Sequence, residues 1–272
     1  MYKTILVHVN PDDPGISDTI SCAVNLAHDY RAKLIGVAAG LPEPMVEVMA
    51  AGAPLLAGGM VIGDEKLLAR HFANARDAFD RSTSGMVETA WRTAIDFPAR
   101  AISTMSAAAD LIVISSQSNA TGLASLGVDC GDLVMRAGRP VLVVPRGKTK
   151  LDLATGIVAW KNTREARRAV ADALPLLAMV EMVTVVHVPE GDEEDPMLVE
   201  IKEMLDRHCI GSSVRRLDRG PAAEQIIDFA IHAHADLIVA GAYGHSRLRE
   251  WALGGVTRAL THQSGIACLY SH

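Results

Sequence analysis

A repeated pattern constrains the fold of this 272-residue chain more than any other feature of its sequence. The run Asp-Leu-Ile-Val occurs at 110–113 and again at 236–239, and a segment that opens with Pro98 or Pro221 and has helical periodicity precedes each run. Short apolar runs bounded by turn residues are typical of buried strands. The same elements in the same order indicate two copies of one α/β unit.

Within each copy, apolar runs alternate with helical segments, which predicts right-handed crossovers and a parallel sheet. The expected strands span residues 3–9, 32–38, 86–91, 110–114 and 140–145, then 156–160, 181–188, 214–217, 236–240 and 266–270. The expected helices span residues 17–30, 63–83, 98–109 and 131–137, then 163–177, 196–208, 221–233 and 256–263. We expect one domain at 1–146 and a second at 154–272, joined by a polar connector.

Local signals mark the start of two helices in the second copy. Asn162 is the predicted N-cap of the first, because Glu165 three residues later completes a capping box. Pro196 opens the next helix, as proline often does at the first helical position. The acidic turn 191–195 before it is expected to be a solvated cap rather than a metal site.

Composition limits the classes of function. Hydrophobic residues make up 49% of the chain, enough for a core, and the net charge of −6 argues against nonspecific nucleic-acid binding. Scattered cysteines favour a reducing compartment, and with no visible signal peptide we expect a cytoplasmic protein. The most apolar stretch, 41–62, contains prolines and glutamates that a membrane-spanning helix would not tolerate, so no membrane is expected as a partner.

A glycine-rich segment follows the strand at 236–240. Two residues separate Gly241 from Gly244, and nine separate Gly244 from Gly254, so the spacing matches neither Walker A nor the dinucleotide fingerprint. Glycines between a strand and a helix suit a phosphate, because the backbone can approach closely and the helix N-terminus attracts anions. The alternative is a turn whose glycines only allow tight packing of helix on sheet.

The spacing Gly-x2-Gly-x9-Gly after an Asp-Leu-Ile-Val strand resembles the nucleotide loop of the universal stress protein family. The resemblance covers nearly the whole chain, as a tandem form. It implies two tandem doubly wound, Rossmann-like α/β units, each a mainly parallel five-stranded sheet with helices on both faces. In dimers of the family the last strands pair, so 140–144 could pair with 266–270 within this chain, in an intramolecular pseudo-dimer.

The resemblance also implies an ATP site in the second copy, which AMP or ADP could also occupy. Val188 would contact adenine, the loop would hold the phosphates, and His245 and Arg247 could reach phosphate oxygens. The sequence itself contains no recognisable catalytic motif, and we assign no catalytic residue and no protein metal ligand. The full set of implied nucleotide-binding residues is Ala159, Trp160, Lys161, Val188, Gly241, Tyr243, Gly244, His245, Arg247, Gly254, Gly255, Val256 and Thr257.

Two positions in the second copy depart from the family pattern. Lys161 stands where an Asp that contacts the ribose or a metal is usual, so the pattern gives little support for Mg²⁺. Lys161 could offset triphosphate charge, or it could be an ordinary turn lysine. Gly255 stands where Ser or Thr is usual, and Thr257 could supply a hydroxyl instead.

The first copy has lost most of this loop. Ser115 and Ser118 replace the first two glycines, only Gly127 remains, and Asn10 stands at the position of the family's Asp. We expect this half to bind nucleotide weakly or not at all and to have a structural role.

The leading hypothesis is a stress-response protein whose ATP occupancy biases its conformation or its choice of partner. The alternatives are a nucleotide-free tandem scaffold and an enzyme with at most slow ATP hydrolysis, since no hydrolase motif is present. A homodimer is a further expectation from the resemblance. The loop 40–59 is expected to be either a lid or partner surface, or a poorly ordered loop. Gly241→Val or Gly254→Val is predicted to abolish nucleotide binding.

Overall fold

The computed structural model describes residues 1–42, 65–116, 126–189, 195–242 and 265–272. Its internal contacts divide the chain into two units. One contains Tyr2–Ala137 and Arg146–Lys150, and the other contains Met1, Gly138–Pro145 and Leu151–His272. Residues 138–145, which the sequence assigned to the first domain, therefore have their contacts in the second unit.

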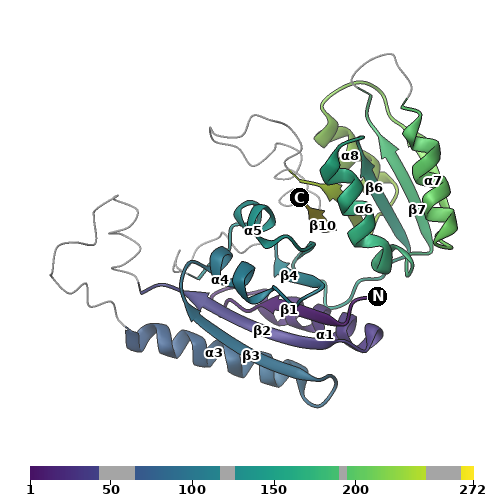
Figure 1. Ribbon diagram of the computed structural model, residues 1–272. Helices are drawn as coiled ribbons and strands as arrows, with labels where there is room; N and C mark the ends of the chain where they lie inside the picture. Colours follow the sequence, from purple (N-terminus) through teal and green to yellow (C-terminus); the bar gives the residue numbers. More distant parts are fainter. Residues whose placement is uncertain (43–64, 117–125, 190–194, 243–264) are drawn as a thin grey trace, which may run out of the picture. The chain divides into compact units, whose positions relative to one another are not determined.

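The first unit is a parallel sheet flanked by helices. Its elements are β1 (Thr4–His8), α1 (Ile16–Tyr30), β2 (Lys33–Gly40), α3 (Glu65–Thr83), β3 (Thr89–Ile95), α4 (Pro98–Met105), β4 (Leu111–Ser115) and α5 (Cys130–Ala137). The strand order is β3-β2-β1-β4, with Val7 of β1 opposite both Gly36 and Val113. Figure 1 shows α3 on one side of these strands and α4 and α5 on the other.

Gly36 in β2 allows the edge strand β3 and helix α3 to pack closely against this strand. A Cβ at this position would lie 2.7 Å from the Trp91 ring and 2.8 Å from the Phe79 ring. The two rings also contact each other, with centroids 5.4 Å apart. The absence of a side chain on β2 therefore makes room for an aromatic pair contributed by α3 and β3.

The second unit is a larger sheet. Its elements are β5 (Val141–Val144), β6 (Thr155–Trp160), α6 (Arg164–Leu177), β7 (Met182–His187), α7 (Met197–Arg207), β8 (Ser212–Arg216), α8 (Ala222–His232), β9 (Leu237–Gly241) and β10 (Ala267–Ser271). The order is β5-β10-β9-β6-β7-β8, and Figure 1 shows α6, α7 and α8 around these strands. The strands from β10 to β8 are parallel, whereas β5 runs antiparallel to β10 with Val143 opposite Cys268. The two segments expected to pair within the chain thus form adjacent strands.

The repeated Asp-Leu-Ile-Val run has the same structural role in both units. Oδ2 of Asp110 accepts hydrogen bonds from the backbone N–H of Lys3 at 2.6 Å and of Thr4 at 2.9 Å. Oδ2 of Asp236 accepts from Ala154 at 3.0 Å and Thr155 at 3.1 Å. Each aspartate therefore ties the start of the unit's first strand to the strand beside it, which explains why the residue recurs.

The structure confirms the expected α/β class, with mainly parallel strands flanked by helices. One strand was displaced in the sequence-based assignment: the third was expected at 86–91 and lies at Thr89–Ile95. The reason is that β3 is an exposed edge strand, whose burial pattern gives only a weak apolar signal. Among the described residues, no helix has both the length and the apolarity needed to cross a bilayer.

Candidate functional site

The carboxyl edge of the second sheet brings the described part of the predicted site together. The chain leaves β6 for β7 on one side and later returns through β9 on the other, so the strand order reverses at β6. In open α/β sheets, ligands bind outside the carboxyl ends of the strands at such a point. The register places Ala159 beside Ala240, one residue before Gly241.

Five of the thirteen predicted residues lie in described segments, and they meet at this edge. Ala159, Lys161, Val188 and Gly241 are partly exposed, whereas Trp160 is buried. The other eight lie outside the described residues: Tyr243, Gly244, His245, Arg247, Gly254, Gly255, Val256 and Thr257. Most of the loop 40–59 and the predicted helix 256–263 also lie outside them.

Gly241 is required by the packing of a helix against a strand end. A Cβ here would lie 2.6 Å from the carbonyl carbon of Glu165 and 2.8 Å from Cα of Ala166, and the backbone nitrogen of Ala166 would be nearer still. These atoms are backbone, so they cannot move aside as a flexible side chain would. The first turn of α6 therefore rests directly on the end of β9, which supports the packing explanation for this glycine.

The N-terminus of α6 is capped by Thr163 and not, as the sequence predicted, by Asn162. The Thr163 hydroxyl accepts from the backbone N–H of Ala166 at 3.3 Å. The predicted spacing was wrong by one residue, because Glu165 does not occupy the third helical position that a capping box requires.

Glu165 is a buried carboxylate in this first turn, and its pKa is lowered. Burial acts to raise that pKa, but hydrogen bonds from its own backbone N–H and from Thr163 outweigh the effect, together with the positive charge of Arg164. Nε of Arg164 donates to Oε1 of Glu165 at 3.1 Å. The negatively charged carboxylate of Glu165 therefore lies in the first turn of α6, beside this edge of the sheet.

Trp160 is held by two hydrogen bonds at the end of β6. Its indole Nε1 donates to Oδ2 of Asp195 at 3.1 Å, and its carbonyl accepts from Nδ1 of His187 at 3.2 Å. The side chain is only 3% exposed. The sequence missed Asp195 as a residue of this edge, although an acidic residue immediately before a proline-initiated helix is a recognisable capping signal.

The start of the glycine segment is fixed by β10. The Ala242 N–H donates to the carbonyl of Ser271 at 2.9 Å, and the Ala242 carbonyl accepts from Nδ1 of His272 at 3.0 Å. Both backbone groups of Ala242 are thus bonded where the chain leaves β9.

The equivalent edge of the first unit contains larger and more buried residues. Val7 pairs with Val113 as Val158 pairs with Val239, so His8 occupies the position of Ala159, and Ser115 that of Gly241. His8 is 2% exposed and Ser115 is 5% exposed. Burial lowers the pKa of His8 to about 4, against an opposite effect of Asp13. At neutral pH His8 is therefore an uncharged imidazole inside the first unit.

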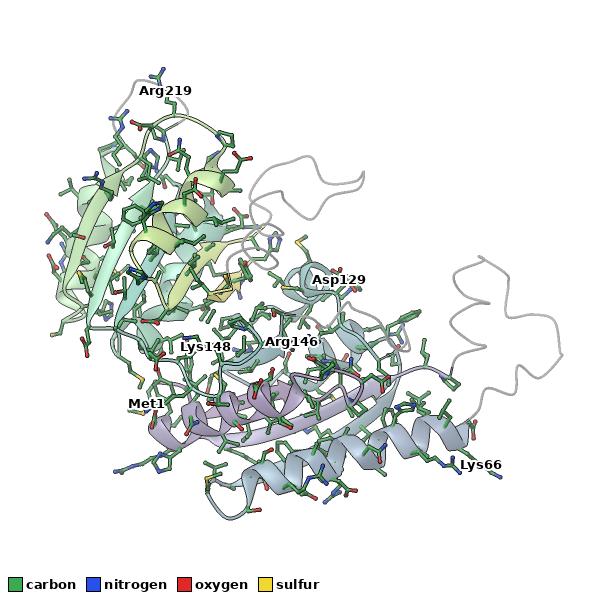
Figure 2. The ribbon with its side chains drawn as sticks, turned by 180° about the vertical axis from the view of Figure 1, so that it is seen from behind. Met1, Lys66, Asp129, Arg146, Lys148 and Arg219 are labelled. Carbon is green, nitrogen blue, oxygen red and sulfur yellow. The ribbon has the colours of Figure 1, made fainter. Side chains whose placement is uncertain are left out.

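Polar groups in the loop after β1 bond mostly to one another. Oδ1 of Asn10 accepts from the Asp12 N–H at 3.0 Å, and Oδ1 of Asp13 accepts from the Gly15 N–H at 2.8 Å. Nη2 of Arg146, a residue labelled in Figure 2, lies 3.9 Å from Oδ1 of Asp13. These bonds hold the start of α1 to the end of β1.

Comparisons with known proteins follow the same division of the chain. The model of the universal stress protein family matches residues 157–270. Residues 157–270 thus form a universal stress protein domain. The match runs from β6 to β10 and so includes the whole edge described above.

Solved structures extend the similarity of fold to nearly the full length of the chain. A universal stress protein from Archaeoglobus fulgidus DSM 4304 has 13% identity and a TM-score of 0.67, with 98% of this chain and 95% of that chain covered. A protein of unknown function from Pseudomonas aeruginosa PAO1 has 16% identity and a TM-score of 0.58, with coverages of 99% and 92%. At these identities the similarity shows a shared fold alone. No curated protein matches the sequence.

Proposed function

We propose that the universal stress protein domain binds an adenine nucleotide, ATP first among them, at the carboxyl edge of its sheet. One observation carries this proposal: small, partly exposed residues stand at the point where the strand order reverses. Ala159 and Gly241 occupy these positions, whereas their counterparts His8 and Ser115 in the first unit are buried. The backbone of α6 already lies against Gly241, so the small, partly exposed Ala159 is the residue that leaves room for a ligand at this edge.

The chemistry of the described residues suits the parts of a nucleotide. Ala159 and Val188 present apolar surface to a base, and the partly exposed Lys161 adds positive charge for phosphate. The phosphates would lie on the glycine segment that begins at Gly241, where backbone N–H groups could donate to them. Among the described residues of the proposed site we assign no general base, and the proposal is one of nucleotide occupancy rather than rapid turnover.

In this proposal the nucleotide acts as a signal in a stress response. Binding at the end of β9 would change the conformational equilibrium of the domain, because the first turn of α6 rests on Gly241. The first unit, with its filled edge, would have a structural role.

A second candidate function is a nucleotide-free scaffold. The observation that favours it is the approach of α6 to Gly241, which explains this glycine by packing alone. The two candidates differ in one measurable property, the affinity for adenine nucleotides.

The test is native mass spectrometry of the purified full chain, followed by calorimetric titration with ATP and AMP. We expect a nucleotide to co-purify, or binding with a Kd below about 1 mM, which corresponds to roughly 4 kcal/mol. If neither nucleotide binds at millimolar concentration, the result supports the nucleotide-free scaffold over the nucleotide-binding function.

A further inference from the structure

Asp195 is a carboxylate fixed from two sides at the edge of the second sheet. Its Oδ1 accepts from the backbone N–H of Met197 at 2.9 Å, at the start of α7. Its Oδ2 accepts from the indole of Trp160 at 3.1 Å, and its carbonyl accepts from the Leu198 N–H at 3.2 Å. The buried indole thus holds the carboxylate beside the end of β6.

This carboxylate keeps part of its hydrogen-bonding capacity. An ionised carboxylate only accepts, and its two oxygens offer about four lone-pair sites in all. One bond to each oxygen is accounted for, and Asp195 is partly exposed rather than buried. Hydroxyl groups are the natural neutral donors for the remaining sites, with bonds stronger than those between neutral groups.

The position of Asp195 along the chain agrees with this chemistry. In the dinucleotide-binding form of the doubly wound fold, an acidic residue downstream of the first strand hydrogen-bonds the ribose 2′-hydroxyl, so a carboxylate near these strand ends suits a ribose. β7 is the second strand of this unit, counted from β6, and Asp195 lies between β7 and α7. His187 at the end of β7 is in register with Trp160, so the two strand ends and the carboxylate are neighbours.

We propose that Asp195 accepts hydrogen bonds from the ribose of the nucleotide and makes the domain selective for ribonucleotides over deoxyribonucleotides. The inference rests on the proposed function of this same site. Trp160 is the positioning residue in this arrangement: it contacts the carboxylate rather than the sugar and fixes its orientation.

The test compares the affinities of the full chain for AMP, 2′-deoxy-AMP and 3′-deoxy-AMP. The wild-type protein should bind AMP roughly tenfold more tightly than at least one deoxy analogue, the loss expected for one hydrogen bond to a charged group. In Asp195→Asn this ratio should fall toward one. The variant should still fold, because the side-chain oxygen of asparagine can accept the same hydrogen bond from the Met197 N–H.

Two further variants separate position from general charge. Asp206→Asn, near the end of helix α7 and in an exposed ion pair with Lys202, should leave both affinity and ratio unchanged. Trp160→Phe keeps an aromatic ring but removes the donor, so it should lower the ribose preference while AMP binding persists.

The outcomes distinguish the two proposals. If the wild-type protein binds AMP and Asp195→Asn shows the same affinities and the same ratio, the role of Asp195 is refuted and the nucleotide site stands. If the wild-type protein binds neither ATP nor any of the three monophosphates, the proposed function fails, and the role of Asp195 with it.

Discussion

The carboxyl edges of the two sheets differ in what occupies the same strand positions. In the second unit, Ala159 and Gly241 are small and partly exposed, and a helix backbone rests on the glycine. In the first unit, His8 and Ser115 hold these positions and are buried. The two edges share strand order and register, so backbone topology alone does not make a binding site. The edge of the second unit, proposed to bind a ligand, differs from the edge of the first unit in the volume and burial of the residues at these two strand positions.

The two units also differ at the start of the helix that follows their first strand. α6 is capped by the Thr163 hydroxyl, while no side chain caps the helix α1 at Gly15. At the start of α1, the Asp13 carboxylate accepts a hydrogen bond from the N–H of Gly15, the residue just before the helix. In each unit a side chain of the protein accepts a hydrogen bond at the start of this helix. The acceptor is a hydroxyl in the second unit and a carboxylate in the first.

The largest effect is expected from Gly241→Val. The added side chain would collide with the backbone of α6, so the second unit should lose about 3 kcal/mol of stability or more, in addition to the predicted loss of nucleotide binding. Chemical denaturation measures the change. Gly211→Val is the matched control, because a Cβ there meets nothing within 4 Å, and it should cost less than about 0.5 kcal/mol. Equal stability of the two variants would contradict the packing assigned to Gly241.

Ala159→His transfers the residue of the first edge to the second. An imidazole at this position should occupy the space assigned to the ligand and weaken ATP binding by roughly 100-fold, or about 2.7 kcal/mol. Calorimetric titration is the measurement. Ala171→His introduces the same side chain at an exposed position of α6 and should leave the affinity unchanged. Normal ATP binding by Ala159→His would place the ligand elsewhere.

The buried His8 should make the first unit sensitive to acid. Its pKa in the folded protein is about 4, below the ordinary value of 6.5, so as the pH falls the unfolded chain takes up a proton before the folded chain does. Stability is therefore complete above pH 6.5 and should fall by roughly 3 kcal/mol on the way to pH 4. Denaturation curves at several pH values measure this loss.

His8→Leu should remove that part of the pH dependence. Within the described ranges, Nε2 of His8 has no hydrogen-bond partner, so an apolar replacement leaves no partner unsatisfied there. His232→Leu, at the exposed end of α8, is the control and should keep the wild-type slope. Identical pH profiles for wild type and His8→Leu would show that His8 is not the titrating group.

The smallest effect concerns the side-chain cap of α6, which the equivalent helix α1 lacks. Thr163→Ala should cost about 1 kcal/mol, because the N–H of Ala166 loses its acceptor. Asn162→Ala, one residue earlier and exposed, should change stability by less than about 0.5 kcal/mol. Thermal or chemical denaturation of the pair decides between them, and a larger loss in Asn162→Ala would restore the cap that the sequence predicted.

Periodicity predicted the helices and strands well where burial was strong and poorly where it was weak. The buried strands β4 and β9 were placed within a residue, whereas the exposed edge strand β3 was displaced. Of the predicted site residues, Ala159 and Gly241 lie at the ends of the neighbouring strands β6 and β9, and their contact with a nucleotide stays a prediction. Trp160, also predicted to contact nucleotide, donates a hydrogen bond to Asp195, and that contact joins segments 35 residues apart. No local pattern encodes such a pairing.

The sequence by itself determined the repeated α/β unit, because alternating apolar runs and the recurring Asp110 and Asp236 dictate strands, crossovers and their alignment. The resemblance to the family suggested that β5 could pair with β10, and the structure shows these two strands as an antiparallel pair. The tertiary structure decided which edge is filled. Whether His8 is buried, or Gly241 touches α6, depends on distances between elements that are remote in the chain, and only close packing sets those distances.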